Sequence, residues 1–195
     1  MAILLLTLLS VLSPVQQQST VPLAGAAMFD QGKTFEDFLA TADARPEVWK
    51  ANAARSKPAK ELVDRLAKAS GGNLRLLVVA VAACSDSVQT VPYVAALAKE
   101  AGVPLRIVDS TVGKAIMEAY RTPDGRAATA TIAVLRGDRV AGAWVERPEG
   151  LQSWMIGPAQ ALAQSERMER KTAWYEWDRG ESTIAELVSL VERLR

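Results

Sequence analysis

Apolar residues recur at intervals of three and four positions over residues 34–70, which is the spacing of amphipathic helices. The residues on this pattern are Phe35, Phe38, Leu39, Ala42, Leu62, Leu66 and Ala69. Pro46, Pro58 and the pair Gly71-Gly72 interrupt it, because neither residue type readily continues a helix. The segment is therefore predicted to form three short helices.

Four later segments have the composition of β-strands. Residues 74–82 are apolar at both odd and even positions, as expected for a strand buried on both faces of a sheet. Residues 105–108 form a shorter apolar run. Residues 129–135 and 140–145 flank Arg136-Gly137-Asp138-Arg139, which suits a tight hairpin turn. We expect residues 74–82 to be the central strand, with residues 105–108 on one side and the hairpin on the other.

Helical spacing returns between and after these strands. It covers residues 85–101 and 113–120, and it resumes at residue 151 with breaks at Gly157-Pro158 and Gly180. The order is strand, helix, strand, helix, hairpin, helix. A crossover makes the first two strands parallel, and a hairpin makes the last two antiparallel. The predicted fold is α/β, with a mixed four-stranded sheet and flanking helices.

Composition restricts the chemistry of the protein. The 195 residues are 49% hydrophobic, which is enough for one sizeable core. Basic residues number 23 and acidic residues 22, without long runs of either sign, so no nucleic-acid partner is expected. The chain has no histidine and one cysteine, which excludes histidine-assisted nucleophilic catalysis, a Cys-x-x-Cys zinc site and an intrachain disulfide. We expect no metal and no cofactor.

The N-terminal region has features of an export signal. Residues 2–12 are an apolar run, shorter than the roughly 20 residues that span a membrane, and Ala24-Gly25-Ala26 supplies small residues for cleavage. No lysine or arginine precedes the run. We predict a signal peptide over residues 1–27, a periplasmic or secreted protein, and membrane contact only through an uncleaved signal. The alternative is that translation starts at Met28, which leaves a cytoplasmic protein.

Cys84 falls between the predicted central strand and the helix that follows it. The stretch Ala83-Cys84-Ser85-Asp86-Ser87 resembles the thioredoxin active-site signature Trp-Cys-Gly-Pro-Cys. Pro92 matches a proline in the first long helix of that family. Residues 34–40, with Trp49, resemble a bacterial subgroup that has a helical N-terminal extension and a Cys-x-Asp-Ser or Cys-x-Asp-Cys site.

The resemblance implies a thioredoxin-like fold in four parts. After the signal peptide, residues 28–72 are the helical N-terminal extension. Residues 73–165 are the thioredoxin-like core, and residues 166–195 are a C-terminal helical extension.

The sequence departs from the family pattern at four positions of the site. Ser87 stands where the resolving cysteine would be, and Ala83 replaces the tryptophan. Val78 takes the place of the buried acid, and Thr129 takes that of the cis-proline. A non-proline cis bond costs about 2.5–4 kcal/mol, so a trans bond is expected between Ala128 and Thr129. These departures exclude dithiol turnover.

The resemblance implies that Cys84 and Ser87 are the catalytic residues, and that the substrate is bound by Ala83, Ser85, Asp86, Ala128 and Thr129. A helix N-terminus favours the Cys84 thiolate, the charge of Asp86 opposes it, and the Ser87 hydroxyl is expected to donate a hydrogen bond to the sulfur. The implied activity is monothiol exchange with protein or small-molecule thiols and disulfides. Without a resolving thiol, an external thiol such as glutathione must release the mixed disulfide.

Other interpretations of Cys84 stay open. It is also compatible with a small buried residue beside a helix that Ser85, Asp86 and Ser87 merely cap. The protein would then be a non-catalytic thioredoxin-fold binding module that uses the former substrate face. A third interpretation is an exported protein that dimerises through an intermolecular disulfide.

The C-terminal third carries two further groups of residues. Its aromatic cluster, Trp154, Trp174, Tyr175 and Trp177, is expected to pack the last helices onto the sheet rather than to form a recognition surface. A charged group is interpreted as a solvated helix face with pairs four residues apart, and consists of Glu166, Arg167, Glu169, Arg170 and Lys171.

Overall fold

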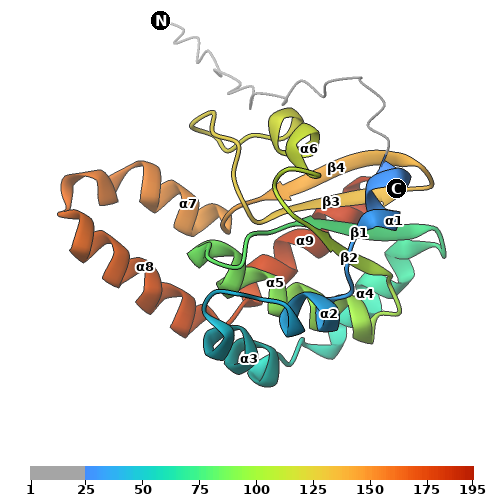
Figure 1. Cartoon of the computed structure of the whole chain (residues 1–195), viewed down its shortest axis with the longest axis horizontal. Coiled ribbons are helices and arrows are strands. Elements are labelled where there is room, and N and C mark those ends of the chain that lie inside the picture. The colour runs from blue at the N-terminus through green and yellow to red at the C-terminus, as the bar shows by residue number, and fades with distance from the viewer. Residues whose placement is uncertain (1–24) are drawn as a thin grey trace, which may run out of the picture.

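The computed structural model describes residues 25–195, and its centre is a four-stranded sheet in the order β2-β1-β3-β4 (Figure 1). β1 (Leu74–Val79) pairs in parallel with β2 (Leu105–Val108) and antiparallel with β3 (Thr131–Arg136). β3 pairs antiparallel with β4 (Arg139–Val145). The predicted mixed sheet and its central strand are confirmed. Two strands are shorter than predicted, since β1 ends at Val79 and β3 begins at Thr131.

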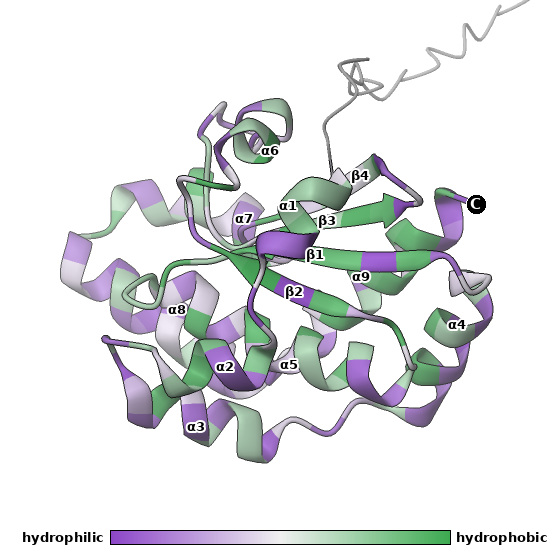
Figure 2. Ribbon diagram, turned by 45° about the vertical axis from the view of Figure 1, so that its right-hand side comes forward, coloured by the Kyte–Doolittle hydropathy of each residue, from purple (hydrophilic) through white to green (hydrophobic). Residues whose placement is uncertain are grey.

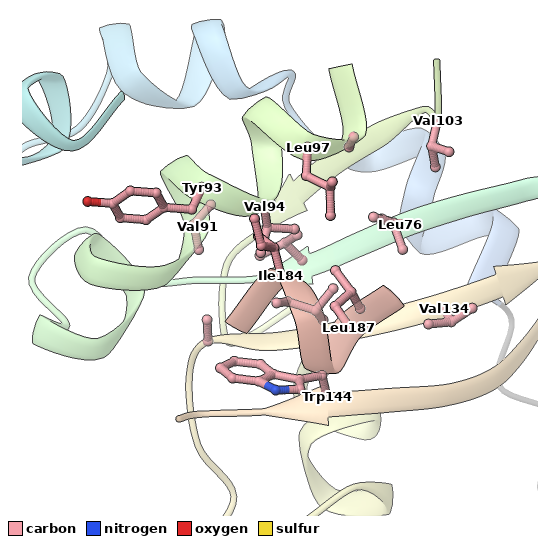
Figure 3. Close-up of a cluster of buried hydrophobic side chains, with 14 of the residues drawn as sticks. Leu76, Val91, Tyr93, Val94, Leu97, Val103, Val134, Trp144, Ile184 and Leu187 are labelled. Atoms are coloured by element: carbon pink, nitrogen blue, oxygen red, sulfur yellow. The ribbon is translucent and has the colours of Figure 1, made fainter. Parts of the chain in front are cut away.

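The larger core lies between one face of the sheet and a layer of helices. α5 (Ser85–Glu100) and α9 (Glu181–Arg193) pack there with α4 (Lys60–Ser70), and α2 (Phe35–Ala40) and α3 (Pro46–Arg55) lie beyond α5. Figure 3 shows Leu76 and Val134 of the sheet facing Leu97 of α5 and Leu187 of α9. The three helices predicted over residues 34–70 are those that form.

The opposite face of the sheet is covered by α1 (Gly25–Gln31) and α6 (Lys114–Ala119). Successive side chains of a strand point to opposite faces. Leu76 and Val78 therefore enter the larger core, whereas Leu77 and Val79 pack with Phe29 and other residues of the second core. This two-sided burial is why β1 has apolar residues at both odd and even positions, and Figure 2 shows the strand mostly in green. Its hydrophilic residue is Arg75.

A helical arm, residues 149–178, leads away from the sheet (Figure 1). It consists of α7 (Glu149–Ile156), the short 3₁₀ helix η1 (Pro158–Ala161) and α8 (Gln164–Asp178). We call this the α7–α8 arm. It has its own apolar cluster, which is separate from both cores and contains Leu151, Met155, Ala159 and Tyr175, with Trp154 and Trp174 packed against them.

The aromatic residues of the α7–α8 arm do not pack where they were expected to. Trp154, Trp174 and Tyr175 pack within the arm instead of on the sheet. Trp177 is 77% exposed, although its ring also makes an edge contact with that of Trp174. The prediction was wrong because helical spacing shows which residues share a face of α8 but not which element covers that face.

The predicted signal peptide lies outside the described residues, except for its last three, which form the beginning of α1. No helix within residues 25–195 is long and apolar enough to cross a membrane. At the other end of the chain, α9 contributes fully buried side chains to the larger core, namely Leu187, Val188 and Val191. α9 is therefore one of the helices that pack against the sheet to form the larger core.

The position of α9 predicts a large loss of stability for Leu187→Ala. The side chain is fully buried, and truncation leaves a cavity between α9 and the sheet, so the free energy of unfolding should fall by about 2–5 kcal/mol. Urea denaturation followed by circular dichroism measures the change. The control is Arg193→Ala at the exposed end of the same helix, which should change stability by no more than about 0.5 kcal/mol. A loss of less than about 1 kcal/mol for Leu187→Ala would mean that α9 is dispensable to the core.

Candidate functional site

Cys84 lies at the N-terminus of α5, in the N-cap position just before the first helical residue. Its backbone is extended, with φ −71° and ψ 123°, and its carbonyl accepts the first helical hydrogen bond from the amide of Val88 at 3.1 Å. A residue of α3 holds the segment between β1 and α5 in place: the indole Nε1 of buried Trp49 donates a hydrogen bond to the carbonyl of Ala82 at 3.1 Å. This arrangement fixes the backbone that presents the thiol.

The thiol is partly buried, and it faces the loop before β3. Its Sγ donates to the carbonyl oxygen of Thr129 at 3.3 Å, so the structure brings together two of the predicted site residues from segments 45 residues apart. Ala83 is exposed beside the thiol, whereas Ala128 is buried. The bond between Ala128 and Thr129 is trans, as expected, but within residues 25–195 a cis peptide bond joins Thr129 to Ala130. The residue after the cis bond is thus Ala130, so the assignment of Thr129 to the cis-proline position was wrong by one residue.

Ser87 does not interact with Cys84 as predicted. Its side chain is fully buried, and its Oγ accepts from the backbone amide of Val81 at 3.5 Å. The expected hydrogen bond to the sulfur was wrong, because the hydroxyl is directed at the loop after β1 and the sulfur pairs with Thr129. Val78, at the position of the family's buried acid, is an entirely buried apolar residue of the larger core.

Asp86 is the centre of a buried group of charges that we call the Asp86 cluster, formed with Arg147, Lys171 and Tyr175. Lys171 Nζ lies 2.9 and 3.0 Å from the two carboxylate oxygens. Arg147 donates through Nε at 3.1 Å and Nη2 at 3.2 Å. The Tyr175 hydroxyl donates at 2.8 Å. Lys171 also donates to Ser85 Oγ at 2.8 Å, so the first two residues of α5 are both bound to α8.

The members of the cluster come from three parts of the fold. Asp86 lies in the first turn of α5, and Arg147 lies two residues beyond the end of β4. Lys171 and Tyr175 are four positions apart in α8, so they project from one face of that helix. The cluster therefore joins the α7–α8 arm to the helix that carries Cys84.

The charges extend outward from Arg147 through further ion pairs. Arg147 Nη2 lies 2.7 Å from a carboxylate oxygen of Glu146, which is also buried. Glu146 is bound in turn by Arg126 at 2.9 Å, and Arg126 binds Asp124 at 2.7 Å near the surface. Acidic and basic groups thus alternate from the surface to the first turn of α5.

The environment keeps these groups in their charged or donating forms. Burial by itself raises the pKa of Asp86, but the charges of Lys171 and Arg147 outweigh it and hold that pKa below its ordinary value. Burial, followed by the charge of Asp86, raises the pKa of Tyr175 well above its ordinary value. Asp86 is consequently an anion at neutral pH, and Tyr175 is a neutral hydroxyl that donates to it.

Two expectations about charge were wrong. Asp86 was expected to contact substrate and to oppose the thiolate, yet its carboxylate points into the protein and is neutralised by two cations. Lys171 was expected on a solvated helix face, yet it is 3% exposed. The buried face of α8 is polar, with Lys171, Tyr175 and Asp178 at helical spacing, so a search for apolar periodicity misses it. The recurrence of these residues at helical spacing was the one signal in the sequence that this face of α8 is buried.

The described residues do not bring together a set of side chains that could bind a metal ion. Within residues 25–195 no group of three or more cysteine, aspartate, glutamate or histidine side chains is placed to hold one. The acids that do lie close together, Asp86, Glu146 and Asp124, are each bound to arginine or lysine.

The cluster predicts that Lys171→Met destabilises the protein. Methionine fills a similar volume but removes three hydrogen bonds and one of the two cations bound to Asp86, so the free energy of unfolding at neutral pH should fall by about 1–3 kcal/mol. The control is Arg170→Gln, whose exposed pair with Glu166 is worth at most about 1 kcal/mol. Equal effects of the two substitutions in urea denaturation would contradict the role of Lys171.

The same variant should show a pH dependence of defined sign. A carboxyl whose pKa is lower in the folded protein contributes stability above its unfolded value, about 3.9, and that contribution disappears as the pH falls through the folded value. The stability difference between the native protein and Lys171→Met should thus be largest near neutral pH, where Asp86 is ionised, and should shrink in acid as that carboxyl becomes protonated. A difference that grows on acidification would show that Lys171 does not act through the Asp86 carboxylate.

Comparison with known proteins agrees with this geometry. Residues 32–172 match a family model described as Thioredoxin. Similar solved structures include a protein of unknown function from Pseudomonas aeruginosa, with 21% identity and a TM-score of 0.64 over 89% of this chain and 99% of that one. Another is an HIV epitope-scaffold protein, with 20% identity and a TM-score of 0.62 over 87% of this chain and 98% of that one. No curated protein matches. The chain belongs to the thioredoxin family.

Proposed function

We propose that this protein carries out thiol-disulfide exchange through Cys84 alone, as a monothiol member of its family acting on protein or low-molecular-weight thiols. The observation that supports this most directly is the position of the sulfur. It lies at the N-terminus of a 16-residue helix, partly open to solvent and beside the exposed Ala83. The positive end of a helix dipole stabilises a thiolate, which is the nucleophilic form of cysteine.

The proposed reaction has two steps. The Cys84 thiolate attacks one sulfur of a substrate disulfide, a new S–S bond forms, and the other substrate sulfur leaves as a thiolate that takes up a proton from water. A second, external thiol then attacks the mixed disulfide and releases Cys84. No second thiol of this chain can perform that step, because Cys84 is its sole cysteine.

Two features near the sulfur bear on this reaction. The carbonyl of Thr129 accepts a hydrogen bond from the thiol. The carboxylate of Asp86, two residues along the helix, is paired with Lys171 and Arg147, so it is not an uncompensated negative charge near the sulfur. We propose that the thiol is released from Thr129 when it reacts, and that substrate sulfur approaches from the solvent-exposed side of Cys84, next to Ala83.

A reaction with a disulfide reagent tests the proposal. The native protein should form a stable one-to-one mixed disulfide near neutral pH, detected as a mass increase at Cys84, and an added thiol should reverse it. Ser87→Cys should convert this trapped adduct into turnover with a dithiol reductant, since a second thiolate three residues away can displace the bound substrate. The reductase assay compares the two proteins directly.

Cys84→Ser serves as the control, because serine is favoured at the N-cap position and should keep the fold while removing all exchange. If Cys84 of the folded native protein does not react, and Ser87→Cys gains no reductase activity, exchange through Cys84 is wrong. The non-catalytic binding module would then be the better account.

A further inference from the structure

A cleft of about 210 Å³ opens beside the Asp86 cluster, between the α7–α8 arm and the loops at the ends of the sheet. Three arginines contribute to its wall: Arg126, Arg147 and Arg167. Asp124 is the acid that lines it, and Arg126 binds that carboxylate. The wall is therefore predominantly basic.

Arg167 differs from the other two arginines in having no counter-charge within the described part of the chain. Arg126 and Arg147 are each bound to carboxylates. The side chain of Arg167 is partly buried, and among residues 25–195 it forms no ion pair and donates no hydrogen bond. Of the charged groups gathered here, four are basic and three acidic: Arg126, Arg147, Arg167 and Lys171 against Asp86, Asp124 and Glu146. One positive charge is left over, and among the described residues Arg167 is the cleft-lining arginine that has no carboxylate partner.

The remaining wall shows what kind of molecule would suit the cleft. Ile156 and Met168 are exposed large apolar side chains, at 39% and 36%, and both line the cleft. Gln164, the first residue of α8, adds an amide, and no side chain caps that end of the helix. A cleft smaller than the roughly 300 Å³ of a drug-sized site suits a small molecule.

We propose that this cleft binds a small aliphatic carboxylate, with its anionic group on the guanidinium of Arg167 and its carbon chain against Ile156 and Met168. Arginine presents paired N–H donors that match the two oxygens of a carboxylate. The apolar wall distinguishes such a ligand from an inorganic anion, which would gain nothing from contact with methionine and isoleucine. This site is additional to Cys84, and its ligand is defined by charge and shape rather than by a thiol.

Calorimetric titration of the full chain with pentanoate tests the proposal, with 1-pentanol as a neutral compound of the same carbon skeleton. Pentanoate should bind saturably at low ionic strength and pentanol should not. Arg167→Gln should weaken pentanoate binding by about tenfold or more, since it removes a charged hydrogen-bonding partner, and Arg167→Lys should retain part of the affinity. The matched control is Arg170→Gln on the same helix, whose side chain is exposed, pairs with Glu166 and does not line the cleft.

Three results would overturn the proposal: no saturable binding of pentanoate, equal binding by the native protein and Arg167→Gln, or equal affinity for inorganic phosphate. Circular dichroism of each variant establishes that it is folded before titration. No disulfide is present in the experiment, so its outcome does not depend on whether Cys84 exchanges thiols.

Discussion

The carboxylate of Asp86 is the interaction on which the arrangement of the site depends. It accepts five hydrogen bonds from Arg147, Lys171 and Tyr175, and it is almost entirely enclosed. Removing a charge from water costs several kcal/mol, and this cost is offset only when opposite charges and donors surround the ion. The cluster is therefore stable only with α5, the end of β4 and α8 all in place. The apolar cluster of the α7–α8 arm is separate from the cores of the sheet, so it does not by itself fix the arm to the body.

A second ion pair supports the same junction. The Arg55 side chain of α3 binds the Glu176 carboxylate of α8 at 2.6 and 3.0 Å, and it also donates to the hydroxyl of Tyr93 in α5. This pair is partly exposed, so solvent and salt weaken it more than they weaken the Asp86 cluster. We therefore assign the main role in fastening α8 to Asp86. The consequence for the site is that Asp86 turns inward, and Cys84, two residues earlier, is left beside Thr129 and partly open to solvent.

Much of the fold could be predicted from the sequence because its signals are local or depend on one periodicity. The two-sided apolar run of β1 and the turn at residues 136–139 together indicate the sheet order. The placement of Cys84 before a helix could also be predicted, since it depends on neighbouring residues. The environment of Lys171 could not, because its partner Asp86 is 85 residues away and a lysine among charged neighbours normally faces solvent. The same limit applies to Thr129, since its bond to the sulfur spans 45 residues and depends on how two loops meet.

Amide hydrogen exchange of the native protein and of Asp86→Asn tests most directly whether the Asp86 cluster holds the α7–α8 arm. The Asp86→Asn substitution removes the counter-charge of Lys171. The buried ammonium group can then be hydrated only if α8 moves away from α5. The exchange-protected amides of residues 164–178 should therefore exchange about tenfold faster or more. The amides of β1 and β3 should keep their protection, and Arg170→Gln should leave both regions unchanged. Unchanged protection of α8 in Asp86→Asn, or an equal loss across the sheet and the arm, would contradict this account.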